Sequence, residues 1–462
     1  MESGRNIIKK RGRFALSPVQ TVIAGFVLVI FAGAFLLSVP LSTTDNSWTP
    51  FIDALFISTS AVCVTGYSTL PVGFYFTGFG QAVLLLLVQI GGLGFMTVTT
   101  LVLMLMRKKI LFRDRLAIGA ALNESGNKGI LRLTRKIVLM TLITEFAGML
   151  ALIAPFCGRN GAVGVWQAAF TSVSAFCNAG FDIFARSAND FSGLNAYIDD
   201  VTVSLTIAFL IIAGGLGFAV ISDVFKNKFR FKRFSFHTKL VLTVTGILLV
   251  AGWAFIFGVE YSNPATLGGH SAGVKLLSSF FQSVSCRTAG FSTVNQSDLR
   301  SASKFLCDIL MFIGASPGST GGGIKTTTFA VLVMTLVSGL KGRGGVAIGK
   351  HSVNQKTVYK SISVTAASLI LVSALATLLL LTEKNYVPAS LLSFENVLHD
   401  SFSAFSTVGL TTNIIPYLSP IGKLFVAVVM FCGRVGLIPV AAAFSGTGGD
   451  LIRYPEAVIP VG

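Results

Sequence analysis

One unit of sequence recurs four times along this chain, and the repeat limits the folds that the chain can adopt. Each copy holds a long apolar run, a short amphipathic run, a step that ends in glycine and a bulky residue, and a second long apolar run. The glycines of the four steps lie at 66, 180, 290 and 409, which are 114, 110 and 119 residues apart. Four units of nearly equal length can close a ring around one axis.

The apolar runs identify a membrane protein. Of the 462 residues, 53% are hydrophobic and only 12% are charged, whereas a soluble domain carries about 25% charged residues. The apolar residues gather in runs of about twenty, the length that a helix needs to cross a bilayer. We therefore predict an all-α polytopic membrane protein.

The formal net charge of +17 could indicate a nucleic-acid partner, but the distribution of the charge argues against one. Of the 36 Lys and Arg residues, 26 lie in alternate segments, at 1–20, 107–136, 226–239, 341–360 and after 445. Basic residues in every second loop mark the cytoplasmic side. The pattern predicts a multi-pass plasma-membrane protein with both termini in the cytoplasm. Acidic residues in the opposite loops would concentrate cations at an outer mouth.

A signal peptide, a disulfide and a metal site are not expected. The apolar run at 21–39 follows basic residues as a signal peptide would, but it is long and other spans follow it. The six cysteines lie mostly in apolar stretches without a CxxC pair, and the four histidines are scattered.

The run lengths predict eight spans and four re-entrant helices that are too short to cross. The spans are expected near 19–39, 77–106, 134–156, 201–225, 239–258, 305–338, 361–382 and 421–444. The short helices are expected near 51–63, 165–177, 273–286 and 394–405. The domains are then an N-terminus at 1–18, repeats at 19–106, 107–225, 226–338 and 339–445, and a C-terminal tail at 446–462. The predicted fold is four copies of span, pore helix and span around one pore with pseudo-fourfold symmetry. Glycine clusters in the second spans, such as 91–94 and 214–217, are interpreted as helix-packing sites.

Each glycine step resembles the Thr-Val-Gly-Tyr strand with which potassium channels replace the water around an ion. Backbone carbonyls can surround an ion if four strands point them at one axis, and glycine tolerates the unusual φ that this requires. Non-helical backbone is allowed at membrane depth only where protein or a water-filled cavity surrounds it. The predicted potassium-binding filter consists of Val64, Thr65, Gly66, Tyr67, Asn178, Ala179, Gly180, Phe181, Thr288, Ala289, Gly290, Phe291, Thr407, Val408, Gly409 and Leu410.

Together with two later motifs, these steps resemble the Trk/Ktr/HKT superfamily of potassium transporters, and most nearly its bacterial Ktr-type membrane subunits. The resemblance covers nearly the whole chain. It rests on VCVTGYST, FCNAGFD, SCRTAGFST and FSTVGLTT, on GASPGSTGGGIKT at 314–326, and on FCGRVG at 431–436. It implies selective K+ uptake, because all four filter positions are glycine, and it leaves Na+ open as an activator. No cofactor is expected on this chain itself.

The same resemblance implies partners. It implies a homodimer in the bacterial inner membrane and a separate cytoplasmic nucleotide-binding ring that regulates transport. The basic loops could contact acidic surfaces of that ring, and anionic membrane lipid would explain these loops equally well.

The second span of the third unit is interrupted, because proline and consecutive glycines break helices. The resemblance implies a loop there that blocks the pore until it moves. The predicted gate consists of Gly314, Ser316, Pro317, Gly318, Ser319, Thr320, Gly321, Gly322, Gly323, Lys325 and Arg434. Arg434 lies at membrane depth and is expected to donate to carbonyls of this loop and to repel cations. Lys325 either acts similarly or lies on the cytoplasmic surface.

Four further charged residues leave alternatives open. Arg287 lies three residues before a filter glycine and is expected to point behind the filter toward an acid. Asp53 and Asp400 are expected near the starts of short helices, where they either cap the helix or attract ions. Glu145 is either the partner of a basic group or a coupling carboxylate.

Three classes of function compete. The leading hypothesis is a selective potassium-conducting subunit. The second is a sodium- or proton-coupled symporter that works by alternating access, which a carboxylate at the midplane outside the filter would favour. The third is a membrane enzyme, for which the sequence offers no nucleophile and base pair.

Overall fold

The computed structural model describes residues 18–94, 97, 130–187, 193–342, 345–349 and 351–444. The regular secondary structure of the described part is helical apart from one small antiparallel hairpin, formed by β1 (Ala347–Ile348) and β2 (His351–Ser352). Most of the predicted N-terminal segment 1–18, the end of the predicted span 77–106 and the tail 446–462 lie outside the described residues.

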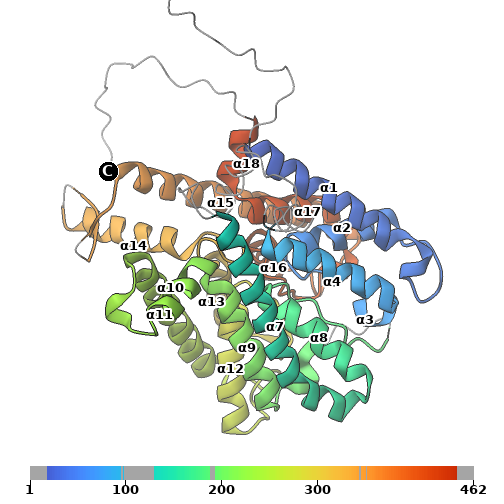
Figure 1. Ribbon diagram of the computed structural model, residues 1–462. Coiled ribbons are helices and arrows are strands. Elements are labelled where there is room, and N and C mark those ends of the chain that lie inside the picture. The colour runs from blue at the N-terminus through green and yellow to red at the C-terminus, as the bar shows by residue number, and fades with distance from the viewer. Residues whose placement is uncertain are drawn as a thin grey trace, which may run out of the picture.

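The described helices follow the fourfold repeat of the sequence (Figure 1). In each unit a first helix precedes a short helix, and a second helix follows the glycine step. The first helices are α1 (Pro18–Ser38), α7 (Ile130–Asn160), α11 (Phe236–Glu260) and α15 (Gln355–Thr382). The short helices are α2 (Phe51–Val62), α8 (Val163–Phe176), α12 (Ala272–Ser285) and α16 (Phe394–Ser406). The second helices are α4 (Gly78–Leu93), α9 (Val201–Leu216) with α10 (Phe218–Lys226), α13 (Ser301–Phe312) with α14 (Thr326–Leu340), and α17 (Pro420–Val435) with α18 (Leu437–Phe444).

Short helical turns lie in the connections. They are α3 (Val72–Tyr75) and the 3-10 turns η1 (Pro40–Ser42), η2 (Gly193–Tyr197), η3 (Phe231–Arg233), η4 (Gln296–Asp298), η5 (Glu383–Asn385) and η6 (Ile415–Tyr417).

Contacts between neighbouring units close into a ring. The second helix of each unit packs against the short helix of the next unit, as α4 on α8, α9 on α12 and α13 on α16. The last contact, α17 on α2, joins the fourth unit to the first. The four short helices and the glycine steps that follow them are therefore held at the centre of the bundle, while the first helices lie farther out.

The outer helices are long and apolar. Within the described residues, four helices are long and apolar enough to cross a membrane, namely α1, α7, α11 and α15. The number rises to six if each of two bent helix pairs counts as one span. Large apolar side chains such as Leu28, Phe31 and Phe35 of α1 are exposed on the outside of the bundle. Such a surface suits hydrocarbon, because its side chains are apolar and each helix satisfies its own backbone hydrogen bonds.

The second helices depart from the prediction. The third breaks between α13 and α14, as expected. The helices found at the spans expected near 201–225 and 421–444 are bent, which the sequence analysis did not predict. The axis turns by 98° between α9 and α10 and by 100° between α17 and α18. Gly217 and Gly436 stand at these breaks with φ of 90° and 94°, and Gly94 ends α4 with φ of 81°. Glycine in this region of φ ends an α-helix.

The glycine clusters also pack closely, as predicted. A Cβ atom on Gly91, Gly214 or Gly433 would collide with a backbone carbonyl at the end of the neighbouring short helix. These clusters therefore bring each second helix against the last turn of a short helix, immediately before a glycine step.

Candidate functional site

The four glycine steps share one unusual backbone conformation. The first residues, Val64, Asn178, Thr288 and Thr407, have φ between 51° and 67°, and the glycines two positions later have φ between 68° and 94°. The residue between them stays at negative φ in every unit. Alternation in the sign of φ turns successive carbonyl groups toward the same side of a strand. A β-branched residue such as Val64 rarely adopts positive φ, so the surrounding protein must hold this conformation.

Hydrogen bonds to the short helices hold each strand from behind. The amide of the middle residue donates to a serine carbonyl in the preceding helix, over 2.8 Å from Thr65 to Ser60 and 2.8 Å from Ala179 to Ser174. The fourth unit repeats this bond over 2.9 Å, between Val408 and Ser403. In the third unit the bond from Ala289 reaches Ser285 over 3.0 Å. Sequence reasoning missed these serines, although three of them stand six residues before the filter glycine.

The four strands stand around one axis. A Cβ atom built on Gly66 would lie 3.1 Å from Cα of Gly180, and one built on Gly180 would lie 2.9 Å from Cα of Gly290. On Gly290 it would strike the carbonyl oxygen of Val408, and on Gly409 it would lie 3.2 Å from Cα of Gly66. The contacts run from the first unit to the fourth and back to the first, so the ring is closed.

The carbonyl groups of the ring are free. No residue in the described part of the chain donates a hydrogen bond to the carbonyls of 64–66, 178–180, 288–290 or 407–409. The first and middle residues of these steps are fully buried. Buried carbonyl groups normally have a partner. A ring of such oxygens can replace the hydration shell of a monovalent cation.

Outside the ring lies an open cavity of about 650 Å³. All four filter glycines line its floor, and its walls include polar side chains from several units, among them Asp182, Asn295, Gln296 and Asn413. This vestibule gives access to the ring from one side.

On the other side the 314–323 loop lies directly against the ring. A Cβ atom on Gly321 or Gly322 would collide with Oγ1 of Thr288 or Thr407, the first residues of two strands. The side-chain amide of Asn178 lies 3.1 Å from Oγ1 of Thr320 in the loop. The loop therefore covers the inner end of the ring.

The backbone of the loop is attached to the end of α9. The amide of Ser316 donates to the carbonyl of Gly215 over 3.0 Å, and that of Thr320 donates to Gly214 over 3.3 Å. In return, the amide of Phe218 donates to the carbonyl of Gly318 over 3.0 Å. The bend at Gly217 thus exposes backbone groups on both sides of it that form hydrogen bonds with the loop.

Two cationic side chains donate hydrogen bonds to carbonyl groups of the loop, and one of them also donates to the end of α4. Arg434 in α17 donates to the carbonyl of Thr320, as expected, and also to Gly91 and Gly92 at the end of α4. Lys325 donates to the carbonyls of Gly321 and Gly322, over 2.7 and 3.4 Å. Lys325 is half-buried and folded back on the loop, which favours the first of its two expected roles over a place on the cytoplasmic surface.

Arg287 and Glu145 have partners that the sequence did not predict. Arg287 is buried behind its strand, and Nη2 donates to the carbonyl of Gly314 over 3.2 Å. Among the described residues it has no carboxylate partner, so the expected acid is wrong. The Glu145 carboxylate accepts a hydrogen bond from the Gln89 amide over 3.3 Å and lies 3.8 Å from the Cys177 sulfur. Among the described residues it has no basic partner.

Neither Asp53 nor Asp400 caps a helix. Asp53 lies in the first turn of α2, but Pro50 is the capping residue, and the Asp53 carboxylate pairs with Lys423 of α17 over 2.6 Å. This ion pair joins the fourth unit to the first. Asp400 lies in the middle of α16, because Ser393 caps that helix.

Asp400 supports the ring from the outer side. Its carboxylate accepts from the amide of Thr412 over 3.0 Å, just after the fourth strand. The hydroxyl of Tyr67 donates to the carbonyl of Asp400 over 3.0 Å and to that of Leu410 over 3.2 Å. These bonds attach the first strand to the fourth.

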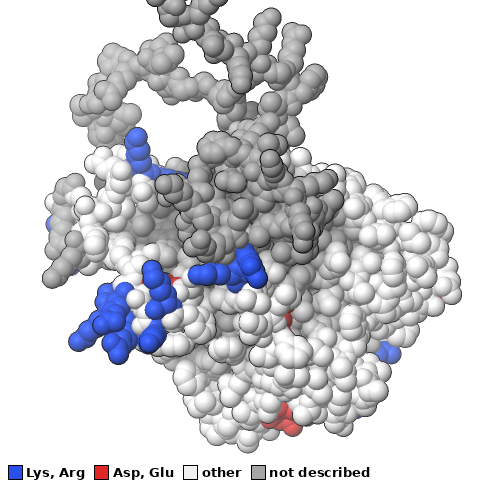
Figure 2. Space-filling model, in the orientation of Figure 1, with Lys and Arg blue, Asp and Glu red and all other residues white. Residues whose placement is uncertain are grey.

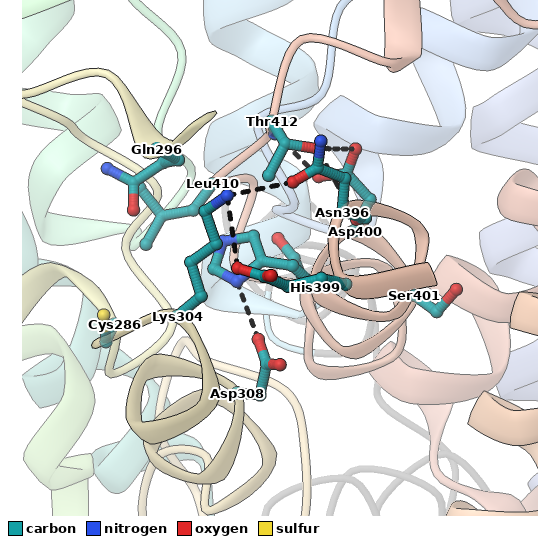
Figure 3. A network of polar contacts seen from close by, with 12 residues as sticks. Cys286, Gln296, Lys304, Asp308, Asn396, His399, Asp400, Ser401, Leu410 and Thr412 are labelled. Atoms are coloured by element: carbon teal, nitrogen blue, oxygen red, sulfur yellow. Dashed lines mark hydrogen bonds and ion pairs between the residues drawn. The ribbon is translucent and has the colours of Figure 1, made fainter. Parts of the chain in front are cut away.

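A buried polar cluster lies next to Asp400, between α13 and α16 (Figure 3). His399 Nδ1 lies 2.7 Å from Oδ1 of Asp308, and Lys304 Nζ donates to Asn396 over 3.0 Å. Lys304 also pairs with Glu395 over 3.3 Å. Sequence reasoning missed this cluster, because His399 of α16 and Asp308 of α13 are 91 residues apart along the chain.

Comparison with known proteins identifies relatives of this chain. The TrkH family, described as "Cation transport protein", matches residues 13–448. The chain is 39% identical over 448 residues to the "Ktr system potassium uptake protein B" of Bacillus subtilis, covering 96% of this chain and 97% of the relative. It is 36% identical over 460 residues to the "Potassium/sodium uptake protein NtpJ" of Enterococcus hirae, covering 99% and 100%.

A solved structure shares the fold. The potassium transporter TrkH from Vibrio parahaemolyticus matches with a TM-score of 0.70 at 17% identity, covering 96% of this chain and 87% of that chain. The chain is therefore a multi-pass membrane transporter and not an enzyme. It belongs to the TrkH family of cation transport proteins.

Proposed function

We propose that this chain takes up potassium across the plasma membrane through the ring of carbonyl groups, which acts as its selectivity filter. The observation that supports this most directly is the closed ring of buried carbonyls without hydrogen-bond donors in the described part of the chain. The relatives named as potassium uptake proteins agree in the transported ion.

The carbonyl ring explains selectivity through backbone geometry. An ion that leaves water needs oxygen ligands of similar strength and spacing, and four strands of alternating φ supply them. The side-chain oxygens of Asn178, Thr288 and Thr407 add to the inner end of the ring, whereas Val64 contributes none. K+ is the transported ion, no cofactor is bound by this chain, and Na+ remains open as an activator.

The 314–323 loop is proposed as the gate. It lies against the inner end of the ring, and the cations Arg434 and Lys325 donate to its carbonyls. A positive charge below the ring opposes the passage of a cation. Transport then requires the loop to move away from Thr288 and Thr407, together with the side chains that hold it.

The topology is proposed as four repeats of span, re-entrant helix and span, with both termini in the cytoplasm. The repeat boundaries are those expected from the sequence, at 19–106, 107–225, 226–338 and 339–445. In this topology the bends at Gly217 and Gly436 would turn the inner parts of the second spans of the second and fourth units across the membrane direction. Basic residues in alternate loops support the orientation.

Membrane subunits of this family work with cytoplasmic regulatory subunits. We further propose a homodimer regulated by a nucleotide-binding ring. Each chain would hold a complete pore, because all four strands come from one chain, so a dimer would have two pores.

The test is potassium uptake by the chain in two settings. Expression should restore growth at low potassium in bacteria that lack their own uptake systems. The purified chain in lipid vesicles should carry K+ or Rb+ faster than Na+. Failure of both assays with folded protein would refute the proposal, and equal rates for K+ and Na+ would refute the filter.

A further inference from the structure

The turn between α10 and α11 combines basic and aromatic side chains at the surface. We call residues 225–239 the basic turn. Six Lys and Arg residues lie in it, and the one carboxylate in residues 215–249 is Asp223. The six are Lys226, Lys228, Arg230, Lys232, Arg233 and Lys239, of which all but Lys239 are exposed. Figure 2 shows Lys and Arg side chains gathered in the region where Figure 1 labels α10 and α11.

Phenylalanines alternate with these cations. The exposed fractions of Phe225, Phe229, Phe231 and Phe236 are 62%, 71%, 53% and 40%. Phe225 and Phe229 stack edge to face with ring centroids 5.5 Å apart, so they pack on each other and not in the core. Phe234, which is buried, fixes the segment to the bundle.

The turn has a defined shape. The Asp223 carboxylate accepts from the Asn227 side chain over 2.8 Å and from the amide of Ser235 over 2.9 Å, which ties the two ends together. Lys228 and Phe229 have φ of 50° and 60°, so the chain reverses within two residues. The cations are therefore presented by a folded turn.

The position of the turn, directly before an apolar helix long enough to cross a membrane, suits the edge of a bilayer. α10 leaves α9 at 98°, so it runs across the direction of that helix. The 25-residue apolar helix α11 begins at Phe236, immediately after the turn. Phenylalanines this close to a span meet the boundary between headgroups and acyl chains.

We propose that the basic turn binds anionic phospholipid of the leaflet that it faces. The phosphate groups would contact the Lys and Arg side chains while the phenylalanine rings enter the acyl boundary. An acidic protein surface would match the charge, but it would not account for exposed phenylalanines at the edge of a span. The inference rests on the proposed topology, which places the turn on the cytoplasmic side.

The experiment measures which lipid the purified full chain retains. The protein is equilibrated in mixed micelles with equal amounts of phosphatidylglycerol and phosphatidylcholine, and bound lipid is counted by native mass spectrometry. The wild type should retain phosphatidylglycerol preferentially. Changing Lys228, Arg230, Lys232 and Arg233 together to Gln should lower the ratio of the two retained lipids about tenfold, because each cation near a headgroup adds to the attraction.

Two control variants test the assignment to this turn. Exchanging Lys for Arg and Arg for Lys at the same four positions should keep the preference. Lys356→Gln with Lys360→Gln removes two exposed cations at the start of α15 and should also keep it. Phe229→Ser with Phe231→Ser should reduce the total lipid retained but not the ratio.

Several results would overturn the proposal. The first is a wild type that does not prefer phosphatidylglycerol, and the second is a four-Gln variant that still prefers it. The third is an acidic regulatory protein that binds the turn and is not displaced by phosphatidylglycerol. The lipid measurement does not depend on ion flux, so it tests the basic turn separately from the proposed function. A wild type that carries no K+ in vesicles would refute the proposed function alone.

Discussion

The filter strands and the 314–323 loop are both non-helical backbone inside a helical bundle, but they are held in different ways. Each filter strand is held by a backbone hydrogen bond to its own short helix, and this bond occurs in all four units. The loop occurs once, and besides its bonds to α9 it depends on side chains from other segments, including Arg434 and Asn178. The strands therefore keep one fixed shape, whereas contacts through side chains allow the loop to be released.

The largest effect is expected where the shared geometry of the strands is broken. Gly290 has φ of 80°, and a Cβ atom there would strike the Val408 carbonyl. We expect Gly290→Ser to lower the K+ over Na+ selectivity by at least about tenfold, which corresponds to ~1.4 kcal/mol. The measurement is the ratio of Rb+ to Na+ flux in vesicles.

Two further variants sharpen this test. Gly66→Ser meets the same kind of collision in the first strand and should act like Gly290→Ser. Gly246→Ser in α11 has no heavy atom within 4 Å of the added Cβ and should leave the ratio unchanged. An unchanged ratio in both filter variants would mean that the ring does not select the ion.

A smaller and different effect is expected at the loop. Arg434→Ala removes donors to Thr320 and to the end of α4, so the loop should leave the ring more often. A shift of ~1 kcal/mol between the two loop positions would raise the K+ flux about fivefold. Selectivity should not change, because the strands keep their own hydrogen bonds.

Arg434→Lys serves as the matched variant. A lysine keeps the positive charge but cannot donate to two carbonyl groups from a planar fork, so its flux should lie between those of the wild type and Arg434→Ala. Unchanged flux and unchanged regulation in Arg434→Ala would refute the role of this residue in the gate.

The smallest effect is expected at Glu145, which belongs to neither region. Its carboxylate contacts Gln89 and Cys177, outside the ring and the loop. Gln can keep a hydrogen bond at this position, and a neutral hydrogen bond contributes little net free energy. We therefore expect Glu145→Gln to change the K+ flux by less than about twofold. Flux measured with and without Na+ checks this. A loss of Na+ dependence in the variant would revive the coupled symporter.

Some features of the two regions could be predicted from the sequence, and others could not. The four glycine steps and the break at 314–323 are local signals, because glycine and proline limit φ and helix continuity wherever they occur. The short helices were recognised by length for the same local reason. The bends at Gly217 and Gly436 were missed, because glycines in an apolar run are also compatible with an unbroken helix that packs closely on its neighbour.

The charged residues show where local reasoning ends. Arg434 was expected to donate to the loop and does so, but its bonds to Gly91 and Gly92 join units more than 300 residues apart. Asp53 was expected either to cap its helix or to attract ions, because nothing near it in sequence reveals Lys423. The partner of a long or buried side chain is a property of packing between units.

The sequence by itself determined the repeat, the membrane class, the filter steps and the place of the broken span, because backbone preferences and apolar length act over a few residues. Only the tertiary structure decided that the four steps close into one ring, that the loop lies beneath it, and which side chains hold the loop. Those facts depend on contacts between helices that are distant along the chain, and such contacts leave no local pattern in the sequence.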